Sequence, residues 1–226
     1  MISISSHCLF HYTHTEGNLK SILEKGLMYS CIGEKIPATH VMYLANAICF
    51  CDIPLSQISE HVSWYGPYAI GFKPQFVKSN GGTPVCYVHS ASSFIKPKSK
   101  STDRIKYFEQ FPITPFLKQN YGKQRRYQCR KASFKNFYDE KEWRIVESNR
   151  WLVFPFTNLQ DKRQIVSDAK IGVKRQYLTF TPEMIDFIIL KERTEVVPFL
   201  NWLKSKSLVL NPETVVISMD MIDNNF

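Results

Sequence analysis

Apolar and polar residues alternate with two different periods near the start of the chain. Residues 9–13, LFHYT, form a short apolar and aromatic run that is typical of a strand. One face of a helix directly after this run is marked by four apolar residues at helical spacing, Leu19, Ile22, Leu23 and Leu27. Asn18 is the expected N-cap of that helix and Gly26 its expected stop. The pattern therefore predicts a strand followed by a helix.

The next apolar segment is longer. Residues 41–51, VMYLANAICFC, read as a strand, and residues 52–66, DIPLSQISEHVSWYG, read as a helix. Pro54 suits the first turn of this helix and Gly66 its end. Asp52 is placed to cap it.

Short strands and helices alternate through the rest of the chain. Residues 67–74 and 84–89 read as strands around the turn Asn80–Gly82, so a hairpin is one expected arrangement. The later expected elements are a helix at 103–110, strands at 142–147, 176–180, 184–190 and 214–219, and a helix at 195–203. This mixture, without a glycine-rich strand-to-helix turn, predicts an α+β fold rather than a doubly wound one.

Length and composition limit the class of protein. With 226 residues, 44% of them hydrophobic, the chain is expected to form one domain over residues 1–226. Neither a signal peptide nor an apolar run of about 20 residues is evident, so we expect a soluble, cytoplasmic protein without membrane contact. The six cysteines lack disulfide-framework spacing, and the pair Cys49 and Cys51 lies in a predicted strand rather than a knuckle. We therefore expect reduced thiols and no metal.

The net charge of +9 is concentrated in one segment. Residues 118–135 contain no acidic residue and carry seven cations: Lys118, Lys123, Arg125, Arg126, Arg130, Lys131 and Lys135. Aromatic residues are interleaved with them and follow directly after: Tyr121, Tyr127, Phe134, Phe137 and Tyr138. Cations that neutralise phosphates and rings that stack on unpaired bases suit single-stranded nucleic acid. A solvated basic loop is the alternative.

Two glutamates are candidates for a functional site. Glu140 and Glu142 are expected at the start of a strand with their side chains on one face, followed on that face by Arg144. Like charges at this distance raise one pKa or recruit a cation. The alternative is a charged strand edge. His11, taken alone, reads as a core histidine satisfied by the backbone.

Several segments together resemble the AbiGi family of abortive phage resistance proteins. They are LFHYT, NLKSILEKGL, ICFCDIPLSQISEHVSWYGPYAIGF, GGTPVCYV and EKEWRIVE, in this order, from about residue 7 to about residue 150. The first strand and helix are also similar to those of DarT-like ADP-ribosyltransferases, which match His11, Thr13 and Leu19 to Leu27. Glu140-Lys141-Glu142 is similar to the E-x-E element of such enzymes. The resemblance implies an ADP-ribosyltransferase-like fold, with a split central β-sheet and peripheral helices.

The same resemblance implies an activity, NAD-dependent mono-ADP-ribosyl transfer by a toxin of anti-phage defence. In this chemistry positive charge develops on the ribose, which a carboxylate stabilises. Glu142 would take that role, Glu140 would orient or deprotonate the acceptor, and His11 would bind the adenosine-side ribose. NAD would be the substrate, held by the following residues: His11, Tyr12, Thr13, Tyr43, Phe50, Asp52 and Arg144. Arg144 would bind the pyrophosphate or pair with a glutamate.

In ADP-ribosyltransferases the loop before the E-x-E element usually recognises the acceptor. In this chain the basic segment occupies that position. Its expected acceptor-binding residues are Arg125, Arg126, Tyr127, Arg130, Phe137 and Tyr138. The expected acceptor is single-stranded nucleic acid, RNA rather than DNA, with an acidic protein as competitor. A cognate antitoxin, with or without a helper protein, would restrain such a toxin.

Two other functions stay open at this stage. AbiGi proteins have been labelled antitoxins, in which case the chain is a non-catalytic binding module and the basic segment is a partner surface. An NAD glycohydrolase, with water as acceptor, is the other alternative.

Overall fold

The fold is built around one large, mostly antiparallel sheet. The computed structural model describes residues 6–37, 39–92, 101–126, 128–155 and 176–225. Within these residues the main sheet has eight strands, in the order β14-β13-β5-β1-β4-β11-β6, with β3 paired to β4 beside that path. The strands are β1 (Leu9–Thr13), β3 (Ser30–Lys35), β4 (Val41–Cys51), β5 (Tyr68–Phe72), β6 (Thr83–Pro84), β11 (Glu142–Pro155), β13 (Ile185–Leu190) and β14 (Val215–Ser218). The expected mixture of strands and helices is thereby confirmed.

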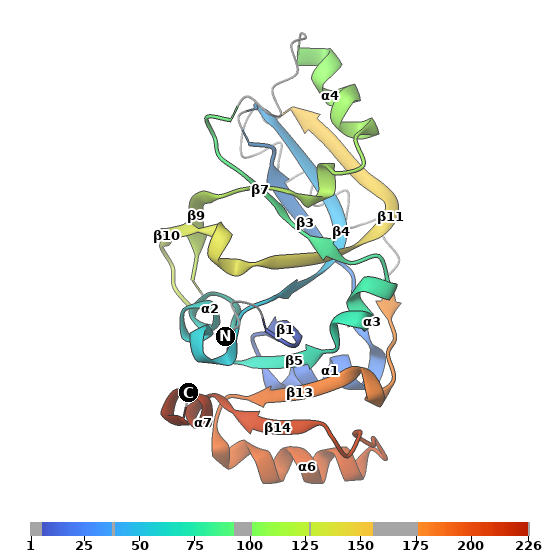
Figure 1. Ribbon diagram of the computed structural model, residues 1–226, viewed down its shortest axis with the longest axis vertical. Coiled ribbons are helices and arrows are strands. Elements are labelled where there is room, and N and C mark those ends of the chain that lie inside the picture. Colours follow the sequence, from blue (N-terminus) through green and yellow to red (C-terminus); the bar gives the residue numbers. More distant parts are fainter. Residues whose placement is uncertain (1–5, 38, 93–100, 127, 156–175, 226) are drawn as a thin grey trace.

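The sheet splits along one edge of β4. On one side β4 pairs with β11 over nearly its whole length, from Val41 to Cys51. On the other side β3 pairs with Met42–Ala47, whereas β1 pairs only at Cys51. Residues 48–50 of β4 therefore lie between two strands that diverge from the same edge (Figure 1). This split is the place where side chains from several strands can meet.

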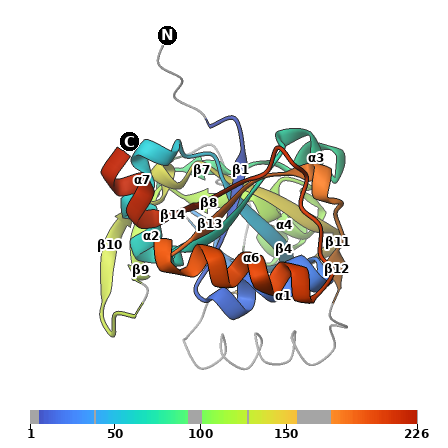
Figure 2. The same ribbon diagram turned by 90° about the horizontal axis from the view of Figure 1, so that it is seen from below.

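Helices cover both faces of the sheet. On one face Leu19 of α1 (Glu16–Lys25) and Phe199 of α6 (Val196–Ser205) belong to one apolar core with Ile70 and Phe72 of β5. These two helices lie side by side (Figure 2), and Lys20 lies over the Trp202 ring. The other face is covered by α2 (Ser59–Tyr65), α7 (Met219–Asn225) and the short helix η1 (Leu55–Gln57).

A group of small elements packs against β3, β4 and β11. It contains α4 (Ser101–Gln110), whose Phe108 is fully buried, and two helical turns, η2 (Thr114–Phe116) and η3 (Phe137–Glu140). Strand β7 (Cys86–Val88) pairs in parallel with β8 (Leu117–Gln119), and β9 (Tyr121–Arg125) forms a hairpin with β10 (Ala132–Asn136). Two shorter strands, β2 (Leu27–Met28) and β12 (Tyr177–Leu178), pair with each other.

The helix predicted after the first strand is confirmed, but its cap is a different residue. Thr15 is the N-cap of α1, and its side chain accepts a hydrogen bond from the backbone N–H of Asn18. The helix therefore begins before Asn18 rather than at it. Gly26 ends the helix as expected, with φ of 97°.

Two other local predictions are wrong. Asp52 does not cap a helix: its carboxylate accepts a hydrogen bond from the Ser6 backbone N–H, and the chain makes the turn η1 before α2 begins at Ser59. The expected hairpin around Asn80–Gly82 is also not formed, because α3 (Pro74–Ser79) follows β5 and the next strands pair elsewhere.

Two further observations concern the length of the helices and the state of the cysteines. No helix among the described residues has the length and apolarity needed to cross a bilayer. All six cysteines are free thiols.

Candidate functional site

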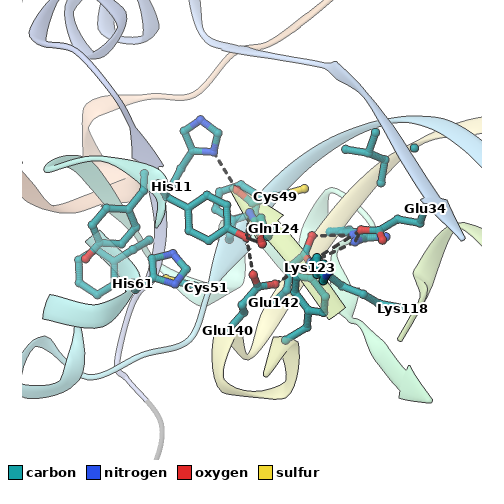
Figure 3. Close-up of a pocket in the computed structure, with 18 residues that line it drawn as sticks. His11, Glu34, Cys49, Cys51, His61, Lys118, Lys123, Gln124, Glu140 and Glu142 are labelled. Atoms are coloured by element: carbon teal, nitrogen blue, oxygen red, sulfur yellow. Dashed lines mark hydrogen bonds and ion pairs between the residues drawn. The ribbon is translucent and has the colours of Figure 1, made fainter. Parts of the chain in front are cut away.

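A cavity of about 430 Å³ lies where the sheet splits (Figure 3). Side chains from β1, β3, β4, α2, β8, β9, η3 and β11 line it. Its lining is Phe10, His11, Tyr12, Ile32, Gly33, Glu34, Cys49, Phe50, Cys51, His61, Tyr65, Lys118, Lys123, Gln124, Phe137, Glu140, Glu142 and Arg144. Most of the predicted catalytic and cofactor-binding residues therefore share one cavity.

The two predicted carboxylates converge, although only one of them is in a strand. Glu142 begins β11, whereas Glu140 ends the helical turn η3. Between them Lys141 has a left-handed backbone, with φ of 43°, which turns the chain. Lys118 Nζ donates to Glu140 Oε2 at 2.6 Å and to Glu142 Oε2 at 2.7 Å. A cation is recruited, as the like charges predict, and that cation is a lysine of the same chain.

Arg144 extends this cluster inward. Its side chain is 1% exposed, and its Nε donates to Glu142 Oε1 at 2.6 Å. One terminal nitrogen donates to Glu34 Oε1 at 2.9 Å, and the other to Tyr43 Oη at 2.7 Å. Of the two roles expected for Arg144, the pairing with a glutamate is the one that is present.

The positive and negative charges at this site are equal in number. Three carboxylates, Glu34, Glu140 and Glu142, lie in contact with three cations, Lys118, Lys135 and Arg144. We call these six residues the ion-pair cluster. Lys135 Nζ lies 2.6 Å from Glu140 Oε1, and the Tyr65 hydroxyl donates to the same oxygen.

The cluster keeps both predicted catalytic carboxylates ionised. Burial by itself raises the pKa of Glu142, but Arg144 and Lys118 outweigh it and hold that pKa well below its ordinary value. For Glu140, burial is likewise outweighed by Lys118 and Lys135, so its pKa is also lowered. Because each oxygen of the two carboxylates accepts from a cation or the Tyr65 hydroxyl, neither group is a free general base.

His11 lines the same cavity from the opposite face of the sheet. Direct cross-strand partners share a face, so Phe10, Cys51 and Glu142 lie on one side. The side chain of His11, the next residue, leaves the strand on the other side, where its ring contacts Phe50. Its Nδ1 donates to the Cys49 carbonyl at 2.8 Å, across the split. Burial lowers the pKa of His11, which favours the neutral ring. The hydrogen bond to the Cys49 carbonyl agrees with the interpretation of His11 as a core histidine whose ring is paired with the backbone.

The other predicted cofactor residues divide into two groups. Tyr12 and Phe50 line the cavity, whereas Thr13, Tyr43 and Asp52 do not. Tyr43 is fully buried, and its hydroxyl donates to the Leu117 carbonyl at 2.8 Å, so its side chain connects β4 to β8 instead. The part of each of these residues in holding a cofactor stays a prediction.

The basic segment is not one surface. Lys118 and Lys135 are buried in the ion-pair cluster, and Phe137 is buried beneath Lys118 Nζ, which lies 4.9 Å from its ring. Arg126 Nη2 donates to Glu60 at 2.8 Å, and its guanidinium lies over the Trp64 ring. The side chains of Arg125, Arg130 and Tyr138 are exposed, and Tyr127 lies outside the described residues.

Among the lining residues that the sequence analysis missed, four are polar or ionisable. Glu34, His61, Tyr65 and Gln124 carry no motif. For His61 a signal was available, because it lies one turn from Ile58 and Tyr65 on the apolar side of the helix. Glu34 had no such signal, since it reaches the site only through the pairing of β3 with β4.

Together the fold and the site define a mixed α/β protein. Its central cavity is lined on one side by residues of the ion-pair cluster. A protein-family profile described as "Putative abortive phage resistance protein AbiGi, antitoxin" matches residues 40–191. No curated protein and no solved structure matches the chain. Because the profile covers more than half of the sequence, the chain belongs to the AbiGi family.

This family membership confirms one expectation and corrects another. The resemblance to AbiGi proteins and the place in abortive infection are confirmed. The expected function, an NAD-dependent ADP-ribosyltransferase toxin, is wrong, because the family is described as an antitoxin. The resemblance to DarT-like enzymes finds no support in these comparisons, and NAD stays an untested prediction.

Proposed function

We propose that this protein is the antitoxin of an abortive infection system, a binding protein that neutralises a toxin without catalysing a reaction. The family description supports this role. The observation that carries it in the site is the ion-pair cluster, in which Glu140 and Glu142 are both engaged by cations of the same chain.

A catalytic carboxylate must be able to change its protonation state or meet developing charge on a substrate. Glu142 can do neither readily, because Arg144 and Lys118 hold its two oxygens at 2.6 and 2.7 Å. A substrate would have to displace one buried cation and leave that charge without a partner, which costs about 3–5 kcal/mol. The same contacts suit a structural role, since they join β3, β8, β10 and β11 at one point.

This proposal changes what the partner is expected to be. The partner that the family description suggests is a toxin of the same defence system. Nucleic acid as an acceptor of ADP-ribose has no place in this function. An ADP-ribosyltransferase-like arrangement of the sheet, without that activity, stays a prediction.

The test measures whether the protein neutralises the toxin of the same system in cells. It compares the wild type with a variant that lacks the Glu142 carboxylate. The variant Glu142→Gln/Lys118→Met removes the predicted catalytic carboxylate together with one cation, so the remaining buried charges stay balanced. Wild type and variant should both restore growth and both co-elute with the toxin in size-exclusion chromatography. Neither should release nicotinamide from NAD.

Two results would contradict the antitoxin proposal. Nicotinamide release by the wild type that disappears in a folded variant would show an enzyme. Growth arrest caused by the wild-type chain alone would show a toxin. Circular dichroism of the variant separates loss of function from loss of fold.

A further inference from the structure

The hairpin of β9 and β10 has two chemically different faces. Its register pairs Phe134 with Lys123 and Lys135 with Gly122. Successive residues of a strand point to opposite sides, so Gly122, Gln124 and Lys135 share one face. That face is turned inward: Gly122 and Lys135 are buried, and Gln124 Nε2 donates to the Tyr65 hydroxyl at 3.1 Å. The hairpin is thus fixed to the body of the protein by its inner face.

The outer face carries two aromatic rings in solvent. Tyr121 is 55% exposed and Phe134 is 59% exposed. Their ring centroids are 5.3 Å apart and their planes differ by 4°, so they form one stacked pair. Both residues are therefore more than half exposed, and the hairpin projects from the side of the sheet (Figure 2). A contiguous exposed apolar patch that is rimmed by polar side chains is typical of a binding surface.

The same hairpin and its connection carry exposed cations. Lys123 Nζ lies 5.1 Å from the centre of the Phe134 ring. Arg125, Arg130 and Lys131 are exposed on β9 and on the connection to β10. Residues 118–135 contain no acidic side chain that could neutralise these charges locally. The surface therefore combines flat apolar rings with positive charge, which is the chemistry that unpaired bases and their phosphates require.

We propose that the outer face of the β9–β10 hairpin binds single-stranded nucleic acid. Bases stack on the Tyr121–Phe134 pair, and phosphates are neutralised by Lys123, Arg125, Arg130 and Lys131. A single strand is favoured over a duplex because only an unpaired base presents a free face to these rings. This binding goes beyond the antitoxin function and does not rest on it.

The experiment measures fluorescence anisotropy of a labelled 12-nucleotide oligo(U) RNA with the full chain. The wild type should bind, and Tyr121→Ser/Phe134→Ser should weaken binding about tenfold or more, because each stacked base is lost. Tyr107→Ser is the matched control, since Tyr107 is 45% exposed and stacks on Phe111 at a different place, in α4. It should leave binding unchanged.

Salt dependence tests the charges separately from the rings. Four phosphate contacts predict a slope of log K against log salt of about −3, and two contacts about −1.4, at roughly −0.7 per phosphate for a single strand. Arg125→Gln/Arg130→Gln should therefore reduce the slope by about half. The serine variant should keep the wild-type slope.

Several results would overturn the proposal. Absence of wild-type binding would do so, as would equal affinity of the serine variant when circular dichroism and the urea midpoint match the wild type. An unlabelled duplex that competes as well as the single strand would indicate groove binding instead. Equal competition by polyglutamate would indicate an acidic protein partner.

Discussion

At the scale of single residues, His61 is the group whose protonation the fold resists most clearly. Its ring lies between those of Tyr12 and Tyr65, with centroids 5.0 and 4.6 Å away. Burial, followed by the nearby charge of Lys135, lowers the pKa of His61 from 6.5 to about 4. Lys118, Glu140 and Glu142 also act on it; the pKa of Lys118 is raised and those of the two carboxyl groups are lowered.

This shift predicts a pH dependence of stability. As pH falls below 6.5 the unfolded chain binds a proton at His61 and the folded chain does not, so the free energy of unfolding decreases until about pH 4. The decrease from this group is about 3 kcal/mol at most, at 1.36 kcal/mol per pKa unit. Urea unfolding at several pH values measures it.

The variant His61→Phe keeps an aromatic ring and removes the proton site. It should flatten the decrease between pH 6.5 and 4. The control His40→Phe changes an exposed histidine and should keep the wild-type slope. His11, whose pKa burial also lowers, leaves a residual decrease of the same sign in both variants. An unchanged slope in His61→Phe would contradict the assignment.

At the scale of elements, the end of α1 depends on one glycine. Gly26 has φ of 97°, and a Cβ there would lie 2.6 Å from the Leu178 carbonyl oxygen. Both the left-handed backbone and the approach of β12 therefore exclude a side chain. Gly17, in the first turn of the same helix, has only Thr15 Oγ1 near its Cβ position, at 3.9 Å.

The two glycines should respond oppositely to the same change. Gly26→Ala should lower the free energy of unfolding by about 1–3 kcal/mol, because strain and contact with backbone add. Gly17→Ala should leave stability unchanged or raise it by up to about 1 kcal/mol, since alanine favours the helix. Thermal unfolding of both variants measures the difference, and equal effects would disprove the argument.

Elements were predictable where local patterns decide them. The strands at residues 9–13 and 41–51 and the end of α1 at Gly26 were found as expected, because side-chain period and glycine geometry act within a few residues. The parallel pairing of β7 with β8 was not predicted. It joins Cys86 to Leu117, and no local pattern encodes a partner that distant in the chain.

At the scale of the whole molecule, the ion-pair cluster joins elements that are distant in sequence. Glu34 comes from β3, Lys118 from β8, Lys135 from β10, and Arg144 from β11. Because these side chains are largely buried, the contacts hold the small elements onto the main sheet. Loss of one partner would leave a buried charge uncompensated.

Double substitution separates the pair from its surroundings. Lys118→Met should lower the free energy of unfolding by about 3–5 kcal/mol, since Glu140 and Glu142 lose their shared cation. Lys118→Met/Glu142→Gln should recover at least roughly half of that loss. Urea unfolding measures both.

The control is an exposed pair. Lys191 lies 2.7 Å from Glu192 with both side chains more than half exposed. Lys191→Met should therefore change stability by less than about 0.5 kcal/mol. If the double variant is less stable than Lys118→Met alone, the two residues do not act as a compensating pair.

The sequence by itself determined most of the local elements, the nearness of the two carboxylates to each other and the place of the basic segment in the chain, because each depends on residues close together in the chain. Tertiary structure alone decided which charges meet. Lys118 and Lys135 look like their exposed neighbours in the sequence, yet they are buried against Glu140. Strand order and register put them there, and these follow from long-range packing that period and composition do not encode.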